Sequence, residues 1–491
     1  FCSFVTSGKT YIRSFDYYSQ EFSEEYLNDL VNGDITSEFV NIDYSKNSGI
    51  ELVTDFLNRT DIKTFPYVDT SNVSSLSQTW QGCTNLKTFP EIDTGKVTNF
   101  NSTWRFDSNL KKVSSTLDTS SGTTFNNTWQ SNGLTSFPSL DISKGISFRE
   151  TWRDNNLLTS FPLLDFSRAT DLTLAWYNCS GITTFPLINT SRVSSWSQTW
   201  HLCSGLKSFP ILDVSLGSDF SYAWNGCSGI TTFPTLDFSR AINLNYSWQN
   251  CVGIKTFPNI NISNVRTFFR TWSGCTGITS FPLLDTSNAY DLSYAWEACS
   301  GITTFPLLNT SKGKTFNYAW YNCTGIKNFP LIDTSKGRDF TIAWNSCTGI
   351  TSFPALNFSS ALTLNSTWRG CTGITTFPLI DTSTATNMQY AWNNCTGITT
   401  FPLINTSKVY SLYWTWYNCT GVTTFPAFNT GECKEFGYAW YNCDAITGFS
   451  SINTSKGIFF DATWNNCGLL TSFPSLDYSS AVRLNGTWQS S

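Results

Sequence analysis

Cysteine has the most obvious potential for chemistry in this sequence, because it is abundant and regularly spaced. Fourteen of the 16 Cys lie three residues after a Trp, for example Cys179, Cys203 and Cys227, which are 24 residues apart. Such thiols could form disulfides between successive repeats or bind a metal, but no C-x-x-C pair of the kind typical of zinc sites is present. A disulfide also needs Cα atoms within about 7 Å, a distance that equivalent positions on the wide side of a coil can exceed. We therefore interpret these Cys as small buried hydrophobic residues, with disulfides between repeats as the alternative.

A column of carboxylates recurs at another fixed point of the repeat, as in Asp69, Asp93, Asp118, Asp141 and Asp165. Paired carboxylates about 5 Å apart could cleave glycosidic bonds, and a row of them could bind calcium. In other repeats Asn stands at the same point, and an Asn side chain cannot act as a nucleophile. Because both Asp and Asn can accept backbone N–H groups, an Asx turn is the favoured interpretation and calcium binding the alternative.

His201 is the only His in the chain, and it follows Trp200 at a point where other repeats carry Tyr177, Asn225 or Gln249. A variable polar position predicts an exposed residue. A catalytic triad or a histidine metal site would need partners that this pattern does not supply. With no cluster of titratable groups, the sequence predicts no enzymatic activity, no cofactor and no metal site.

The elements that must position these residues are copies of one repeat. Eighteen of the 20 Trp fall on one lattice from Trp80 to Trp488, almost always 24 residues apart. With Trp as slot 0, the repeat reads W-x-x-C-T-G-I-T-T-F-P-x-I-D-T-S-x-x-x-x-F-x-Y-A, and all 16 Pro occupy slot 10. The apolar slots 6, 9 and 12 predict a short parallel strand, such as Ile302 to Phe305, which Pro ends because it has no N–H to donate.

Asp-Thr-Ser at slots 13 to 15 predicts an Asx turn that leads into a Ser N-cap. The apolar spacing that follows predicts a short helix or 3-10 segment, closed by a left-handed Gly such as Gly325. Slots 17 and 20 vary together. Where slot 17 is Gly, as in Gly313, slot 20 is Phe, as in Phe316, and where slot 17 is Ala, slot 20 is Leu or Met. We infer that the two side chains share one interior volume.

These features predict a repeat solenoid of the leucine-rich-repeat type, with 24-residue coils that each contain a short parallel strand, an Asx/Ser turn and a short helix or 3-10 segment. Residues 1–60 lack the lattice Trp, but they contain an echo of the repeat in Phe39, Ile42, Asp43, Ser45 and Phe56. We therefore expect an N-terminal cap with a degenerate first coil over 1–60 and a solenoid of about 18 repeats over 61–491. The sequence stops within a repeat, so we expect the C-terminal end of the solenoid to be open.

Three columns are candidate binding surfaces. Aromatic residues at slot 22 could stack on sugar rings or anchor a partner, although they could equally pack between coils. Leu residues at slot 11 could form an edge that contacts another subunit. Thr residues at slots 7 and 8, as in Thr303 and Thr304, could form an ice-binding array, but neighbouring strand residues face opposite ways and Lys interrupts slot 7. The slot 22 column comprises Tyr222, Tyr246, Tyr294, Tyr318, Tyr390, Trp414 and Tyr438, and the slot 11 column comprises Leu163, Leu187, Leu283, Leu307, Leu331, Leu379 and Leu403.

The repeats resemble the BspA-like leucine-rich-repeat surface proteins, whose units combine an aromatic-x-x-Cys, an aliphatic strand and an Asp-Thr-Ser turn. The stretch from Thr286 to Pro306 shows the match, and the resemblance covers about residues 39–491. Trp in place of the family's usual Phe, together with Pro after the strand, looks like repeat proteins of marine bacteriophages. The resemblance implies a cell-surface or virion-surface setting, such as a tail fibre, and it supplies no catalytic residues.

Composition narrows the classes of partner. Only 13% of the residues are charged, with 30 Lys+Arg against 35 Asp+Glu, which argues against nucleic-acid binding, and no apolar run approaches the roughly 18 residues of a membrane span. We expect a non-enzymatic extracellular or virion-surface protein for attachment or host recognition, or a fibre component, within a larger assembly. Its partners would be a surface glycan, a protein receptor or other fibre subunits. The alternatives are a structural spacer or filament subunit and, less favoured, an ice-binding solenoid.

Overall fold

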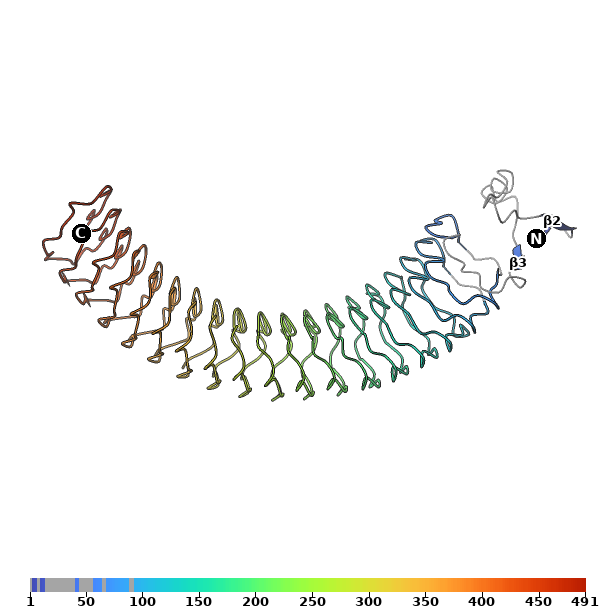
Figure 1. Cartoon of the computed structure of the whole chain (residues 1–491). Helices are drawn as coiled ribbons and strands as arrows, with labels where there is room; N and C mark the ends of the chain where they lie inside the picture. Colours follow the sequence, from blue (N-terminus) through green and yellow to red (C-terminus); the bar gives the residue numbers. More distant parts are fainter. Residues whose placement is uncertain (1, 7–8, 14–39, 44–55, 64–67, 88–91) are drawn as a thin grey trace. The chain divides into compact units, whose positions relative to one another are not determined.

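The computed structural model describes residues 2–6, 9–13, 40–43, 56–63, 68–87 and 92–491, and the chain divides into two compact units. Phe1–Gly217 is here called the N-terminal unit and Ser218–Ser491 the C-terminal unit. Within each unit the chain winds into one coil per Trp repeat, and successive coils lie side by side (Figure 1). This arrangement is the predicted solenoid of the leucine-rich-repeat type.

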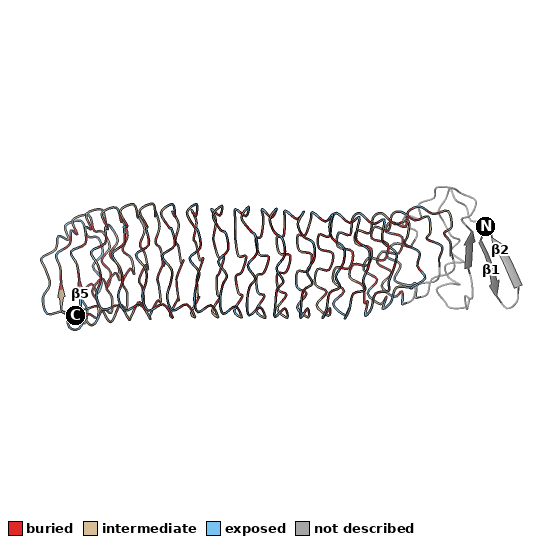
Figure 2. Cartoon of the chain, turned by 90° about the horizontal axis from the view of Figure 1, so that it is seen from below, coloured by how far each residue is buried: buried red, intermediate tan, exposed pale blue. Residues whose placement is uncertain are grey.

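Each coil buries the same apolar slots. In the coil of Trp320, the side chains of Trp320, Cys323 and Ile326 are fully buried and Phe329 is 6% exposed. Buried residues recur in the same way in successive coils of each unit (Figure 2). The interior is therefore a set of columns, each made of one slot, rather than one central cluster.

The largest of these columns consists of stacked Trp rings. The ring of Trp320 lies 5.5 Å from that of Trp296 and 5.1 Å from that of Trp344, with 7° between the planes in both pairs. Phe329 meets Trp320 edge-on at 4.9 Å. Aromatic pairs in these geometries add to the stabilisation from buried area. The column explains the regularity of Trp in the repeat, since a smaller side chain would leave a gap between two neighbouring rings.

The predicted strand is shorter than expected. At slots 8 and 9 of the described coils, two-residue strands form only at β5 (Thr424–Phe425) and β6 (Gly448–Phe449), which pair in parallel. Slot 8 of other coils of the C-terminal unit makes single parallel bridges such as Thr304↔Asn328. Thr303 and Thr304 are both exposed, so the side chains do not alternate as in a strand. The backbone bends between its two buried apolar slots instead of running straight.

The predicted helix or 3-10 segment is wrong. The described residues contain neither, and the segment from slot 20 to the next slot 2 forms another ladder between coils. The amide of Tyr318 donates to Thr341 O in the next coil, whereas the amide of Ala319 donates to Phe316 O in its own coil. Tyr318 and Asn322, at slots 22 and 2, have φ values of 56° and 58°. Left-handed residues at this spacing exclude a right-handed helix.

Gly325 is not left-handed, contrary to expectation; Gly226 and Gly274, which occupy slot 2, are. A Cβ on Gly325 would lie 2.4 Å from Ser300 O and 2.7 Å from Ile302 O. Gly is therefore favoured at slot 5 of this coil because the chain passes directly against the backbone of the preceding coil, although Asn85, Leu157 and Ala445 occupy slot 5 elsewhere.

The predicted Asx turn is confirmed. The amide of Ser311 donates to Asn309 Oδ1 at 3.2 Å, and no helix follows for Ser311 to cap. The Thr between them has a role that the sequence did not reveal. Thr310 is buried, and its hydroxyl donates to Asp333 O in the next coil at 2.6 Å. Asp-Thr-Ser thus closes a turn and also ties neighbouring coils together.

The shared interior volume of slots 17 and 20 is confirmed. Gly313 and Phe316 are both buried, and a Cβ on Gly313 would lie 2.5 Å from Phe316 Cζ. The ring of Phe316 thus fills the space that a side chain at slot 17 would occupy.

We predict that Gly313→Leu destabilises its coil by about 1–3 kcal/mol, because the added atoms would overpack this volume. Denaturant unfolding followed by circular dichroism measures the change. Gly468→Leu is the matched control, since a Cβ on Gly468 would meet nothing within 4 Å. An unchanged unfolding curve for Gly313→Leu would refute the shared-volume interpretation.

The N-terminal end contains a four-stranded sheet in the order β2-β1-β3-β4. Its strands are β1 (Cys2–Thr6), β2 (Lys9–Arg13), β3 (Val40–Asp43) and β4 (Val68–Asp69). β1 is antiparallel to both β2 and β3, whereas β3 and β4 are parallel. The parallel direction of the coils therefore gives way to an antiparallel hairpin at this end.

The register of β3 and β4 supports the predicted echo of the repeat. Ile42 lies opposite Val68 and Asp43 opposite Asp69, which places them at slots 12 and 13. Phe56 stacks on Trp80 with the centroids 6.3 Å apart, as a slot 0 residue would. The other two residues of the echo, Phe39 and Ser45, lie outside the described residues, as does much of 1–60. The boundary between a cap over 1–60 and a solenoid over 61–491 therefore stays a prediction.

Candidate functional site

The aromatic column at slot 22 lies entirely in the C-terminal unit, and its rings are half-buried. Tyr222 and Tyr246 stack with centroids 4.2 Å apart, and Tyr294 and Tyr318 stack at 4.5 Å, with 8° between the planes in each pair. Trp414 lies 4.8 Å from Tyr438. These ring faces pack against one another between coils, so the column presents mainly ring edges and hydroxyl groups to the solvent.

Cations cover part of this column. Arg270 takes slot 22 in its own coil, and its guanidinium lies 4.1 Å from the ring centroid of Tyr294. It also forms an ion pair with Glu297 at 2.9 Å. Partial burial raises the pKa of Tyr318, so its hydroxyl stays protonated at neutral pH. The column is therefore suited to hydrogen bonding along its edge rather than to face-on stacking of a sugar.

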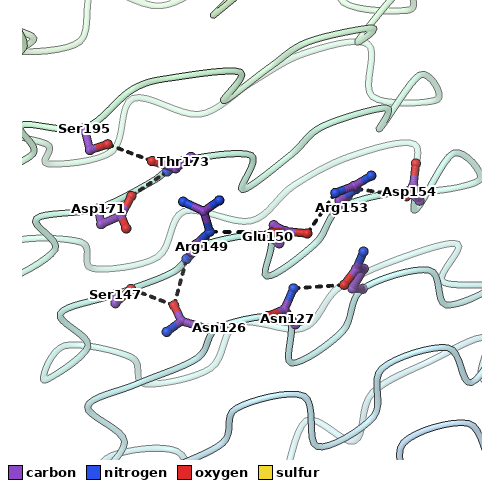
Figure 3. Close-up of polar contacts among 11 residues, drawn as sticks. Asn126, Asn127, Ser147, Arg149, Glu150, Arg153, Asp154, Asp171, Thr173 and Ser195 are labelled. Atoms are coloured by element: carbon purple, nitrogen blue, oxygen red, sulfur yellow. Dashed lines mark hydrogen bonds and ion pairs between the residues drawn. The ribbon is translucent and has the colours of Figure 1, made fainter. Parts of the chain in front are cut away.

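Slot 22 is polar in two coils of the N-terminal unit (Figure 3), whereas the aliphatic Leu174 occupies it in the following coil. Glu150 occupies it and pairs with Arg153 at 2.8 Å, and Arg153 also contacts Asp154 at 3.2 Å. Asn127 occupies it in the preceding coil and donates to Gln130 at 2.9 Å. The same backbone position thus carries either an aromatic or a polar side chain without a change of fold.

The Leu column at slot 11 is exposed, as predicted for an edge. The named Leu side chains are 59–67% exposed, and Ile211, which the sequence analysis left out, continues the column at 70%. Leu163, Leu187 and Ile211 follow one another in the N-terminal unit, and Leu283, Leu307 and Leu331 do so in the C-terminal unit. A line of exposed aliphatic residues at this density is typical of a contact surface.

The Thr columns at slots 7 and 8 both face the solvent, which removes one objection to an ice-binding array. The hydroxyl of Thr303 donates to Thr279 O at 3.3 Å, so slot 7 also bonds to the preceding coil. Lys255 and Lys327 still interrupt slot 7, so the hydroxyl surface is not continuous.

The interpretation of the Cys column as buried hydrophobic residues is confirmed. The Cys from Cys83 to Cys467 are buried free thiols. At slot 3 each Sγ typically donates to the carbonyl of the preceding Trp, as Cys203 Sγ does to Trp176 O at 3.0 Å. Burial raises the pKa of Cys203 to about 12, which leaves almost no reactive thiolate at neutral pH. Within the described residues, no three His, Cys, Asp or Glu side chains gather as a possible metal site.

The carboxylates at slot 13 accept backbone amides in Asx turns, as predicted. His201, by contrast, is not the exposed residue that the sequence predicted. Asp285 accepts the amide of Ser287 at 3.0 Å, and hydrogen bonds from Ser287 lower the pKa of that carboxyl. His201 is half-buried and meets Tyr177 edge-on at 4.9 Å. Burial lowers the pKa of His201 to about 4. Slot 1 varies because neighbouring coils pack there with different side chains, not because it is fully solvated.

Three consecutive coils of the N-terminal unit replace the slot 3 Cys by a buried polar residue: Asp107, Asn132 and Asn155. Asn155 Nδ2 donates to Trp129 O at 2.7 Å, which reproduces the bond made by the thiol elsewhere. Asn132 Oδ1 accepts the amide of Asp107 at 3.1 Å. The two amide side chains are therefore compatible with this interior position.

Asp107 is less well accommodated. Its carboxyl oxygens have no hydrogen-bond partner with good geometry among the described residues. Burial raises its pKa to about 8, and the backbone amides of Cys83 and Gly82 only partly oppose this rise. Asp107 is thus a titratable group in an apolar interior. It was not predicted from the sequence, because slot 3 was interpreted from the Cys residues that occupy it in most coils.

The C-terminal unit also contains a groove that was not predicted from the sequence. It has a volume of about 370 Å³ and is lined by Arg240, Ile242, Asn264, Arg266 and Asn288. These residues occupy slots 16 and 18 of consecutive coils. A cluster of basic residues at these two slots could have indicated the groove in the sequence. The net charge of the whole chain, −5, does not reveal this local cluster.

No protein-family model and no curated protein sequence matches the chain. Among solved structures, it is similar to a leucine-rich repeat protein from Bacteroides ovatus, with 13% identity, coverage of 64% of this chain and 78% of that chain, and a TM-score of 0.40. A leucine-rich cell surface protein from Faecalibacterium prausnitzii shows 16% identity, coverage of 67% and 83%, and a TM-score of 0.37. A leucine-rich repeat protein from Eubacterium ventriosum shows 14% identity, coverage of 89% and 92%, and a TM-score of 0.23. These similarities concern repeat architecture alone.

Among the described residues, no helix has the length and apolar character needed to cross a membrane.

Proposed function

We propose that the chain is a non-enzymatic, extracellular repeat protein that attaches to other molecules at a cell or virion surface or forms part of a fibre there. The observation that carries this proposal is the exposed Leu column at slot 11. Exposing aliphatic side chains in consecutive coils is unfavourable unless another surface covers them. The resemblance of the repeats to BspA-like surface proteins supports the same setting.

The occupant that we favour for this column is another protein subunit of the same kind. In the C-terminal unit, Leu283, Leu307 and Leu331 stand in consecutive coils whose backbones are held together by ladder bonds. A second copy could bury its own Leu column against this one, because both columns would have the same spacing. The same contact would serve a fibre component or a structural spacer, which is the principal alternative function.

We predict that replacing Leu283, Leu307 and Leu331 by Gln weakens self-association at least about tenfold, because each change removes an aliphatic contact worth roughly 1 kcal/mol or more. Sedimentation velocity over a range of concentrations measures the association. Gln at Val252, Leu362 and Val482 is the matched control, since these three are exposed apolar residues of the same unit outside the column. A wild-type chain that stays monomeric, or a control variant that dissociates equally, would contradict the proposal.

The aromatic column is the proposed surface for a receptor, either a glycan or a protein. Its row of ring edges and hydroxyl groups suits hydrogen bonding to such a partner. Slot 22 of the N-terminal unit, where the side chains are polar or aliphatic, does not offer the same surface. Ice binding through the Thr columns is the minor alternative, and thermal hysteresis measured on the same preparations separates it from protein contact.

A further inference from the structure

We propose that the C-terminal unit binds a linear acidic polysaccharide, one that carries sulfate or carboxylate groups at regular intervals, along a basic strip at slots 16 and 18. The strip comprises Arg240, Arg266, Lys312, Lys314, Lys336 and Arg338, which come from four of five consecutive coils; the middle coil carries Asn288 and Tyr290 at these slots. All six side chains are exposed. This surface differs from the Leu column, so the inference does not rest on the proposed function.

The charges of the strip are not neutralised within the described part of the chain. None of the six cations forms an ion pair there, although seven contacts between Arg or Lys and carboxylates occur elsewhere. Slots 16 and 18 of these five coils contain no Asp or Glu. Asp291 and Asp339, at the adjoining slot 19, are half-buried and accept the amides of Ser293 and Thr341 at 2.9 Å. The strip is therefore a concentrated positive surface on a chain whose net charge is negative.

Backbone hydrogen bonds fix the spacing of these charges. The amide of Lys314 donates to Tyr290 O at 2.8 Å, and the amide of Arg338 donates to Lys314 O at 2.8 Å. One bond per coil in a parallel arrangement holds equivalent residues about 4.8 Å apart. Slot 17 between the two basic slots is buried, as in Gly313 and Gly337, so both basic slots turn outward. The result is two groups of cations at a fixed separation, on either side of the coil that carries Asn288 and Tyr290, along which an extended polyanion can lie.

The groove at one end of the strip suits a sugar as well as an anion. Asn264 Nδ2 donates to Ser239 O at 2.6 Å and Asn288 Nδ2 donates to Ser263 O at 2.7 Å, which holds both amide groups in place in the lining that they share with Arg240 and Arg266. Ile242 is 56% exposed beside them and offers an apolar face. Fixed amides, a small apolar surface and flanking cations are the groups that a sugar ring with an acidic substituent would contact.

Other anionic partners fit this surface less well. A row of exposed carboxylates at slot 13, including Asp237, Asp285 and Asp333, runs along the same coils, so a flat anionic membrane would meet repulsive charges beside the strip. Duplex DNA, with one charge per about 1.7 Å, would be repelled by a protein of net charge −5. Single strands usually bind on rows of stacking aromatic residues, whereas slots 16 and 18 of these five coils contain one aromatic residue, Tyr290. A narrow, less densely charged polymer can lie on the basic row alone.

Calorimetric titration of the full chain with heparin and with polygalacturonate tests this inference. Neutral dextran and oligo(dT) are the comparison probes, and each titration is made at low and at moderate salt. We expect at least one acidic polysaccharide to bind, dextran not to bind, and affinity to fall as salt rises. The triple variant R266Q/K314Q/R338Q should bind about tenfold more weakly. The proposal is overturned if oligo(dT) binds more tightly than both polysaccharides. It is also overturned if neither heparin nor polygalacturonate binds.

The matched control is K255Q/K327Q/R369Q, which removes the same charge from exposed positions of the same unit outside the strip. It should retain wild-type polysaccharide binding, and equal loss in both variants would show that net charge alone is measured. Self-association is followed in parallel: the strip variant should associate as the wild type does. Loss of polysaccharide binding with intact association, or the reverse, therefore separates failure of this inference from failure of the Leu contact.

Discussion

Trp320→Ala is expected to destabilise the C-terminal unit by about 3–5 kcal/mol, the cost typical of truncating a large buried aromatic side chain. Trp320 is fully buried, stacks between Trp296 and Trp344, and meets Phe329 edge-on. Removing its ring leaves a gap in the column of rings and takes a partner from each neighbouring coil. Denaturant unfolding gives the magnitude, and hydrogen exchange shows whether the loss centres on the coils next to Trp320.

Two further variants make the test specific. Trp488→Ala is the control, because Trp488 is 40% exposed and its stacking partner Trp464 is 6.3 Å away, so a much smaller effect is expected. Trp320→Phe should cost less than Trp320→Ala. It keeps an aromatic ring in the column and removes an indole N–H that has no hydrogen-bond partner among the described residues. Equal destabilisation by Trp320→Ala and Trp488→Ala would show that the column does not support the coils.

Asp107→Asn is expected to stabilise the N-terminal unit at alkaline pH by an amount on the order of 5 kcal/mol, with a much smaller effect near pH 5. The pKa of Asp107 is raised from its ordinary 3.8 to about 8 in the folded chain. Between these pH values the folded chain holds a proton that the unfolded chain has released. The wild type therefore loses stability as pH rises from about 4 to about 8, and the loss is complete above the folded pKa.

Asn at this position removes the titration and also restores a donor. At the equivalent position, Asn155 donates to the carbonyl of the preceding slot 0 residue, Trp129. Hydrogen exchange of the coils around Trp80 and Trp104, corrected for the pH dependence of intrinsic exchange, measures the local stability at pH 5 and pH 8.5. The reciprocal variant Asn155→Asp should introduce the same pH dependence into its own coil. If wild type and Asp107→Asn lose protection in parallel with rising pH, the assignment of the buried proton to Asp107 is wrong.

The sequence alone was sufficient for the features that depend on side-chain burial. The repeat period, the buried slots and the shared volume of Gly313 and Phe316 could be predicted, because packing constrains the side chains at these slots in the same way in each repeat. The Asx turn could be predicted because Asp and Asn interchange there. The Leu edge could be predicted because slot 11 accepts aliphatic and polar residues alike.

Backbone conformation was harder to predict. The apolar spacing after the Asx turn matches a helix, but alternate amides in this segment bond to the next coil, a pattern that leaves no periodicity in the side chains. One signal was available: slot 2 is often Asn or Gly, as in Asn322 and Gly274, which are the residues that most readily adopt a left-handed conformation. Slot 22 gave no such signal, since Tyr318 and Ile342 are left-handed there without being of a suitable type.

The candidate surfaces were found unequally. Columns of one residue type, such as the Tyr and Leu columns, are visible in an aligned repeat. The basic strip is not, because its Arg and Lys residues are divided irregularly between slots 16 and 18. Only the folded coil brings Arg240 and Arg266 to one groove. The unusual state of Asp107 could not be predicted for a different reason. A single carboxyl at slot 3 is unusual only if that slot is buried, and the structure shows that it is.

The hydrogen bonds that join neighbouring coils also determine how the C-terminal unit responds to mechanical load. They run from one coil to the next at several points of each junction, for example from Tyr318 N to Thr341 O and from Arg338 N to Lys314 O. Under tension along the direction of stacking, the bonds of one junction share the load, whereas successive junctions each bear all of it. The force that the unit withstands is therefore set by its weakest junction, and additional repeats would increase its reach without changing its strength.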